Sequence, residues 1–211
     1  MDNSFYFNTP IKRIEKPEYL NSLINFTELH IKESKKELKK FIEERNKNLN
    51  KDIKDRGISY HSTPLMKYDE TRNFSDYVLN VSEVFLKEIG YDLNNYKMFM
   101  TELWVQEFSK NGGGYHESHV HYDSHISGFY FLKCSENTSY PVFHDPRPAK
   151  RVTQLPLINE KEITLGSDKI FYKVTPGTFL FFPSYLEHEF IPDLGIDPFR
   201  FIHFNVQAIR K

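Results

Sequence analysis

The chain has 211 residues, and its 28 Lys and Arg against 29 Asp and Glu give a formal net charge of −1 at pH 7. Aromatic residues make up 16% of the sequence, whereas disordered chains are poor in them. Proteins that bind nucleic acids usually carry a basic excess, which this chain lacks. The composition therefore predicts one folded domain and argues against nucleic acid as a partner.

The sequence also argues against a membrane span and against disulfide bonds. No apolar run approaches the roughly 20 residues that a bilayer requires, and residues 1–10 lack the pattern of a signal peptide. The single cysteine, Cys134, can form neither an internal disulfide nor a CxxC motif. We therefore expect a cytoplasmic protein, in which any metal is bound by His, Asp or Glu.

Two helical segments are predicted in the first half of the chain. Residues 17–56 carry apolar residues at helical spacing, with Pro17 at the start and Gly57 after the end, and form one long helix or two shorter ones. Residues 75–89 carry one apolar stripe and are followed by Gly90. Acids and bases alternate in the first segment, which indicates a solvent-exposed face.

From residue 98 onward, strand-forming stretches alternate with Gly and Pro. The expected strands cover residues 98–108, 126–132, 169–174, 178–182 and 199–206. Many short strands after a helical segment predict a mainly β fold, with helices packed against a β-sandwich or an open barrel. We expect a single domain, 1–211, in which a helical segment, 1–95, braces a β core, 96–211. Residues 149–169 are expected to form a long loop or a hairpin at the rim, where substrate is selected.

Histidines are concentrated in one short segment, which contains His116, His119, His121 and His125. In a strand, His119 and His121 would point to the same face, because side-chain directions repeat every two residues. His188 follows the aromatic strand 178–182 and is a third candidate ligand. Converging imidazole nitrogens suit Fe, Zn, Cu or Ni. The alternatives are an exposed histidine-rich loop and, for His188, a packed core histidine.

Arg200 lies in the strand after His188, between Phe199 and Phe201. A guanidinium is costly to bury unless it holds an anion, and its planar fork binds a carboxylate through two hydrogen bonds. Arg200 is therefore a candidate carboxylate-binding residue. A strand-surface arginine, with its aromatic neighbours on the opposite face, is the alternative.

A series of motifs occurs in a characteristic order. They are His119-Val120-His121, 126–132, Asp145-Pro146-Arg147, Pro176-Gly177-Thr178, Phe182-Pro183-Ser184 with His188, and Arg200 with Phe204-Asn205. In order and spacing they resemble a family of 2-oxoglutarate and Fe(II)-dependent oxygenases of bacteria and their phages, and the similarity runs from about residue 60 to the C-terminus. The resemblance implies a double-stranded β-helix, a jelly-roll or cupin-like barrel. It also implies hydroxylation of a substrate with release of succinate and CO2.

In the wider superfamily, an HxD pair and a distal histidine bind iron, and an arginine beyond them binds the far carboxylate of 2-oxoglutarate. The resemblance implies His119 and His188 as iron ligands and Arg200 as this arginine. His121 stands where the aspartate is expected, which leaves three interpretations: a three-histidine site of His119, His121 and His188, an HxD frame moved to Asp123, or two histidines with an exogenous anion. We favour the three-histidine site, because its spacing to the next strand matches the family.

Two other functions remain open at this point. A cupin-like metal dioxygenase or isomerase would use the same histidines without 2-oxoglutarate, and a non-catalytic barrel would bind no metal. The prime substrate could be a protein side chain, a free amino acid, a nucleobase or a small metabolite. The expected partners are the small-molecule co-substrate and, through the helical segment, a second copy of the chain in a homodimer. A membrane partner is not expected.

Overall fold

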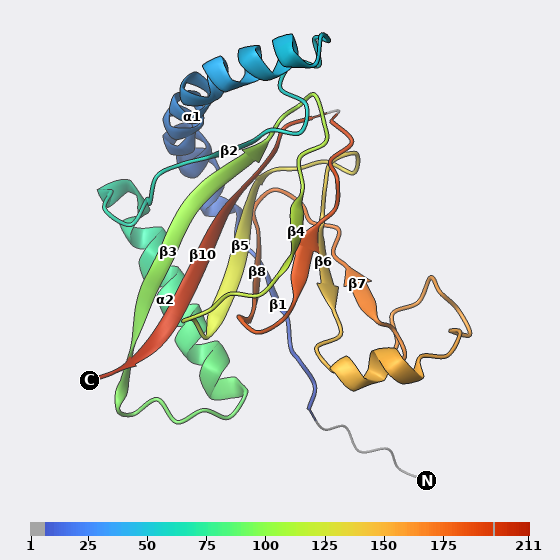
Figure 1. Ribbon diagram of the computed structural model, residues 1–211. Coiled ribbons are helices and arrows are strands. Elements are labelled where there is room, and N and C mark those ends of the chain that lie inside the picture. The colour runs from blue at the N-terminus through green and yellow to red at the C-terminus, as the bar shows by residue number, and fades with distance from the viewer. Residues whose placement is uncertain (1–6, 196) are drawn as a thin grey trace.

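The computed structural model describes residues 7–195 and 197–211, and this part of the chain contains two antiparallel β-sheets (Figure 1). The six-stranded sheet contains, in spatial order, β1 (Lys12–Glu15), β8 (Thr178–Pro183), β5 (Ile126–Lys133), β10 (Phe199–Arg210), β3 (Tyr96–Phe108) and β2 (Ser59–His61). The four-stranded sheet contains β4 (His116–His119), β9 (His188–Phe190), β6 (Pro141–His144) and β7 (Lys169–Phe171).

The order of the strands along the chain defines the fold. From β3 to β10 the chain crosses repeatedly between the two sheets, because β3, β5, β8 and β10 lie in one sheet and β4, β6, β7 and β9 in the other. All the strand pairs are antiparallel. This is a double-stranded β-helix, and the predicted fold class is confirmed.

Aromatic residues fill the space between the sheets. The strands β5, β8 and β10 are buried on both faces, which explains their nearly continuous apolar sequences. One buried cluster lies between the sheets and is dominated by phenylalanine: Phe108, Phe129, Phe131, Phe143, Leu180, Phe182, Leu186, Phe190, Phe199 and Phe201. The alternate side chains of the same strands, such as Phe179, Ile202 and Phe204, belong to a second cluster that includes helical residues.

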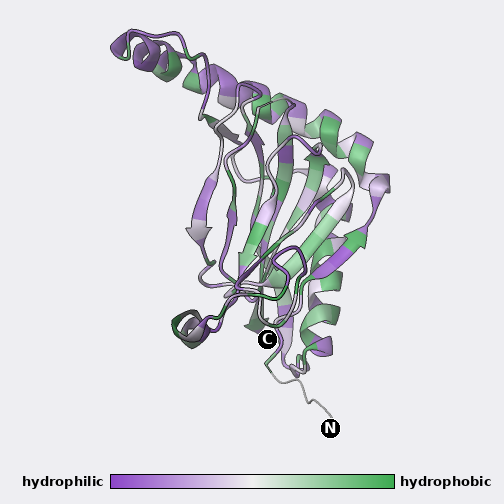
Figure 2. Cartoon of the chain, turned by 90° about the vertical axis from the view of Figure 1, so that its right-hand side faces the viewer, coloured by the Kyte–Doolittle hydropathy of each residue, from purple (hydrophilic) through white to green (hydrophobic). Residues whose placement is uncertain are grey.

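Two α-helices cover the outer face of the six-stranded sheet (Figures 1 and 2). α1 (Leu20–Asn48) follows a 3₁₀ turn, η1 (Pro17–Tyr19), and α2 (Arg72–Glu88) follows another, η2 (Asp69–Thr71). The buried residues of α1 all lie in its first half: Leu23, Thr27, His30, Ile31 and Ser34. None of the described helices is long and apolar enough to cross a bilayer.

The N-terminal part of the chain departs from the predicted helical segment in two ways. The first helix ends at Asn48 instead of residue 56, and the chain then turns through left-handed conformations at Asn50 and Lys54 (φ 49° and 54°). In addition, β1 and β2 extend the six-stranded sheet by pairing with β8 and β3. Both strands are only three or four residues long, too short for a periodic signal in the sequence.

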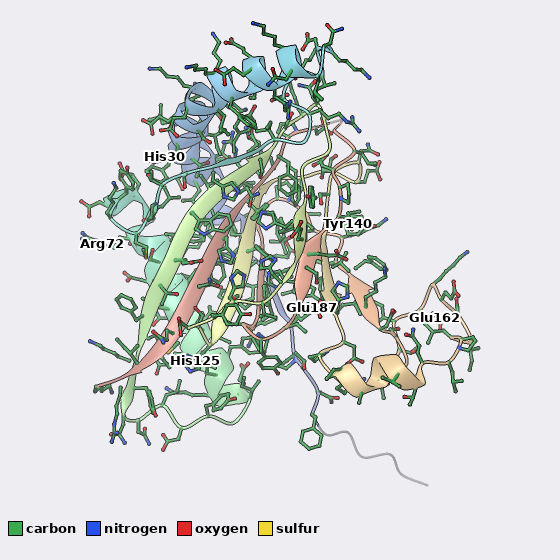
Figure 3. The ribbon with its side chains drawn as sticks, viewed as in Figure 1. His30, Arg72, His125, Tyr140, Glu162 and Glu187 are labelled. Atoms are coloured by element: carbon green, nitrogen blue, oxygen red, sulfur yellow. The ribbon has the colours of Figure 1, made fainter. Side chains whose placement is uncertain are left out.

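The predicted rim loop forms an arm beside the four-stranded sheet. It contains a 3₁₀ helix, η3 (Pro148–Thr153), followed by irregular chain up to β7. Figure 3 shows Glu162 on this arm, far from the central strands. The arm carries several exposed apolar side chains, among them Leu155 and Ile158.

Candidate metal centre

The structure brings the three predicted histidine ligands together. His119, at the end of β4, is paired with His188, at the start of β9. His121 follows in the next loop, where its backbone N–H donates to the Ser184 carbonyl at 3.0 Å. The ring centroids are 4.5 Å apart for His119 and His188, 5.0 Å for His119 and His121, and 5.1 Å for His121 and His188. One potential ligand atom from each residue lies within 4.8 Å of the other two.

Backbone contacts orient two of these rings. The Nδ1 of His119 lies 2.6 Å from the Glu117 carbonyl oxygen, and the Nδ1 of His188 lies 2.9 Å from that of Leu186. When Nδ1–H donates to a carbonyl, the lone pair of the imidazole is left on Nε2, where it can bind a metal. His121 and His188 each have a buried Nε2 without a hydrogen-bond partner among the described residues. A metal ion would satisfy these costly unpaired atoms, so the three residues fit an Fe(II) ion.

Burial keeps the rings of His188 and His121 neutral. It lowers the pKa of His188 well below its usual value. Burial, together with the neighbouring His203 and His119, lowers the pKa of His121 to about 3. Metals bind the neutral imidazole, so His188 and His121 are in the metal-binding form at neutral pH.

Asp123, the alternative carboxylate, is placed differently. Its side chain is exposed, and its backbone has a left-handed conformation with φ 56°. Two groups of three potential ligands occur among the described residues, and Asp123 belongs to neither of them. The structure therefore favours His121 over Asp123 beside His119 and His188.

The histidine cluster continues from His121 towards β3. The His203 ring, on β10, stacks on the His121 ring with centroids 4.6 Å apart and planes 29° apart. On the other side of His203 lies Trp104, at 4.5 Å. The carboxylate of Glu102 lies 3.5 Å from the Nε2 of His203. The sequence analysis did not single out Glu102, although strand alternation places it on the same face as Trp104.

Apolar rings form the wall behind His188. The rings of Phe182, Phe129 and Phe143 lie 4.7, 5.6 and 6.0 Å from its ring. On the exposed side, Glu187 accepts a hydrogen bond from Ser118 at 2.8 Å, which links β4 to the start of β9 (Figure 3). The candidate site is therefore enclosed by apolar rings on the side of His188.

The structure does not bring Arg200 to the histidines. Its guanidinium is 1% exposed and donates through Nε to Glu107 Oε2 at 2.7 Å, while its Nη2 lies 3.0 Å from Glu28 Oε2 on α1. Arg200 is an odd number of positions from His203, so the two side chains point to opposite faces of β10. Arg200 does hold a carboxylate, as its burial requires, but that carboxylate belongs to the protein. Its predicted role in binding 2-oxoglutarate therefore finds no support in these contacts.

Comparisons with known proteins agree with the fold. Among solved structures, AviO1 from Streptomyces viridochromogenes has a TM-score of 0.58 at 12% identity, and the match covers 94% of this chain and 90% of that one. A Pseudomonas putida prolyl-4-hydroxylase has a TM-score of 0.53 at 9% identity, covering 95% and 92%. IDO from Bacillus thuringiensis has a TM-score of 0.52 at 14% identity, covering 95% and 90%. At such low identities these structural similarities establish a shared fold alone.

The sequence itself matches a known family over about half of its length. No curated protein matches the chain. Residues 102–205 match the family model described as "Putative 2OG-Fe(II) oxygenase". The matched region runs from β3 to β10 and contains His119, His121 and His188. Through this region the chain matches the 2OG-Fe(II) oxygenases, enzymes that depend on Fe(II) and 2-oxoglutarate.

Proposed function

We propose that His119, His121 and His188 hold the Fe(II) of this oxygenase, which hydroxylates its substrate and releases succinate and CO2. The observation that carries the assignment is the convergence of three ring nitrogens within 4.8 Å. The unpartnered, buried Nε2 atoms of His121 and His188 support it. Three ligands from one side of an ion leave positions open for the co-substrate and O2.

The residues around the site prepare it for this chemistry. Bound Fe(II), together with 2-oxoglutarate and O2, would supply the oxidising power. The carbonyls of Glu117 and Leu186 fix the tautomers of His119 and His188 before any metal arrives. The aromatic wall behind His188 keeps water from that side of the ion.

Arg200 is left out of this proposal, because its guanidinium is engaged by Glu107 and Glu28 on the helix side of the sheet. We also propose a cytoplasmic location, since a single cysteine is typical of a reducing compartment. Homodimer formation through the helical segment remains part of the proposal. Its check is the molar mass of the protein in solution by light scattering.

Anaerobic calorimetry tests the function directly. Metal-free protein is titrated first with Fe(II) and then with 2-oxoglutarate. We expect 2-oxoglutarate to bind only after iron, and His188→Ala to lose this iron-dependent binding. The matched control is His144→Ala, because His144 lies on the neighbouring strand β6 and contacts Glu189 instead of the cluster.

The other results would point to the alternative functions. Iron binding without 2-oxoglutarate binding would favour a cupin-like enzyme that needs no keto acid. The absence of any metal binding would favour a non-catalytic barrel. Equal 2-oxoglutarate binding by the His188→Ala variant would contradict the assigned ligands.

A further inference from the structure

A second group of potential metal ligands lies on the other side of His121. Glu102 from β3, His121 and His203 from β10 each offer one ligand atom, and these atoms lie within 4.8 Å of one another. The set contains two imidazoles and one carboxylate, a combination that binds divalent first-row metals. It shares His121 with the three-histidine group but uses neither His119 nor His188.

His203 is the residue that most needs a partner. Its side chain is 1% exposed, and its ring is enclosed by Trp104, Phe129 and His121 at centroid distances of 4.5, 5.6 and 4.6 Å. Neither ring nitrogen has a hydrogen-bond partner among the described residues. A buried imidazole without a hydrogen bond is costly in free energy and calls for a ligand.

Glu102 supplies negative charge at the same place. Its Oε2 lies 3.5 Å from His203 Nε2, and it accepts a hydrogen bond from Asn205 Nδ2 at 2.8 Å. That bond fixes the orientation of the Asn205 amide, because a carboxylate accepts hydrogen bonds from the NH2 group only. Ser127 agrees with this orientation, since its Oγ donates to Asn205 Oδ1 at 2.6 Å.

The same amide determines which way the His121 lone pair faces. Asn205 Nδ2 lies 3.2 Å from His121 Nδ1 and is oriented to donate to it. The Nδ1 lone pair of His121 therefore faces the Asn205 amide, which also donates to Glu102. The Nδ1 atoms of His119 and His188 instead lie against carbonyl oxygens. A neutral imidazole has one lone pair, so the two groups compete for His121.

We propose that Glu102, His121 and His203 form a second metal-binding site, which takes a divalent cation such as Co(II), Mn(II) or Fe(II). The site places a carboxylate beside the bound cation, which the three-histidine group does not. It does not require 2-oxoglutarate, and its metal binding stands or falls independently of the proposed function.

Co(II) is the probe, because its visible absorption reports its ligands. The His119→Ala variant disables the three-histidine group at a partly exposed position, where folding is least at risk. We expect this variant to bind one Co(II) per chain in equilibrium dialysis. Adding Glu102→Gln should weaken Co(II) binding by at least about tenfold. Removing a residue that only hydrogen-bonds to a metal ligand already reduces metal affinity by about this factor, and Glu102 is a proposed ligand itself. Adding Glu117→Gln instead is the matched control and should leave Co(II) binding unchanged, because the side chain of Glu117 belongs to neither group.

Every outcome decides the proposal. Absence of Co(II) binding in folded His119→Ala, or binding that Glu102→Gln leaves unchanged, would overturn it. His188→Ala provides a second background with the same expectation. The proposed function is tested separately by iron-dependent 2-oxoglutarate binding in Glu102→Gln, which keeps all three histidines. If Co(II) binding in His119→Ala is absent but iron-dependent 2-oxoglutarate binding is present, the second site has been wrongly assigned. The reverse result would show that the three-histidine site has been wrongly assigned.

Discussion

His116 and His121 are kept neutral by their surroundings, and this lowers the stability of the fold when the pH falls. Burial, aided by the neighbouring histidines, lowers the pKa of His116 to about 3, and His121 has a similar value for the same reason. In the unfolded chain both would return to about 6.5. The folded protein therefore resists protonation that the unfolded chain accepts.

This difference predicts that metal-free protein loses stability in acid. Between pH 6.5 and about 3, the unfolded state binds more protons, so the free energy of unfolding falls as the pH is lowered. His116 and His121 together contribute a slope of roughly 2.7 kcal/mol per pH unit in the middle of this range. Urea denaturation with a chelator present, at a series of pH values, measures the slope.

A single substitution isolates one of these groups. His116→Asn should reduce the slope by about 1.4 kcal/mol per pH unit, because one of the two protons is no longer taken up on unfolding. The same slope in the variant and the parent protein would show that His116 is not held neutral by burial.

At the scale of the elements, the site depends on strand pairs that are distant in sequence. The strands β5, β8 and β10 could be predicted from their runs of strand-forming residues, and so could the HxH spacing at His119. The pairing of His119 with His188 could not, because the register between β4 and β9 is set by packing in three dimensions. Glu102 was missed for the same reason, since only the pairing of β3 with β10 brings it to His203.

Arg200 illustrates another limit of sequence analysis. Its burial between phenylalanines was predicted to require an anion, and that requirement is met by Glu107. The sequence does not show which carboxylate is used, because a cofactor and a side chain offer the same chemistry. The odd spacing from Arg200 to His203 was the one signal available that they lie on opposite faces.

Gly128 on β5 lies between β8 and β10, and the close packing there leaves no room for a larger side chain. A Cβ atom there would overlap the Phe204 ring and the backbone oxygen of Leu180. We expect Gly128→Ala to lower the free energy of unfolding by about 3 kcal/mol, because the Leu180 backbone cannot move aside as a flexible side chain would. Urea denaturation checks this.

Gly166→Ala on the exposed arm is the matched control, since the atoms nearest its Cβ belong to the side chains of Leu157 and Thr164. It should change stability by no more than about 0.5 kcal/mol. Equal effects of the two substitutions would mean that β5 does not pack as described.

At the scale of the whole molecule, buried charges join the helical layer to the barrel. Arg200 on β10 and Glu107 on β3 form an ion pair. Two residues of α1 extend it: Glu28 Oε2 lies 3.0 Å from Arg200 Nη2, and Lys35 Nζ lies 2.5 Å from Glu107 Oε1. Arg200 also donates to Thr27 of α1 at 3.4 Å. The network fixes the first half of α1 over the two strands that carry Glu102 and His203.

Arg200→Ala should therefore destabilise the protein without disabling the iron site. Removing it leaves Glu107 buried with Lys35 as its remaining ionic partner, and we expect a loss of about 3 kcal/mol in urea denaturation. Arg147→Ala removes an exposed guanidinium and leaves its partner Asp145 paired with Lys150, so it should cost at most about 1 kcal/mol. Iron-dependent 2-oxoglutarate binding should survive in folded Arg200→Ala. A variant of normal stability that loses this binding would restore Arg200 as the co-substrate residue.

The most direct test of the metal centre is a crystal structure of the protein prepared anaerobically with Fe(II) and 2-oxoglutarate, with anomalous data collected at the iron edge. We predict an anomalous peak bonded to the Nε2 atoms of His119 and His188 and to His121, with 2-oxoglutarate completing the coordination. Iron bound only by Glu102, His121 and His203, or no iron near His188, would contradict the account.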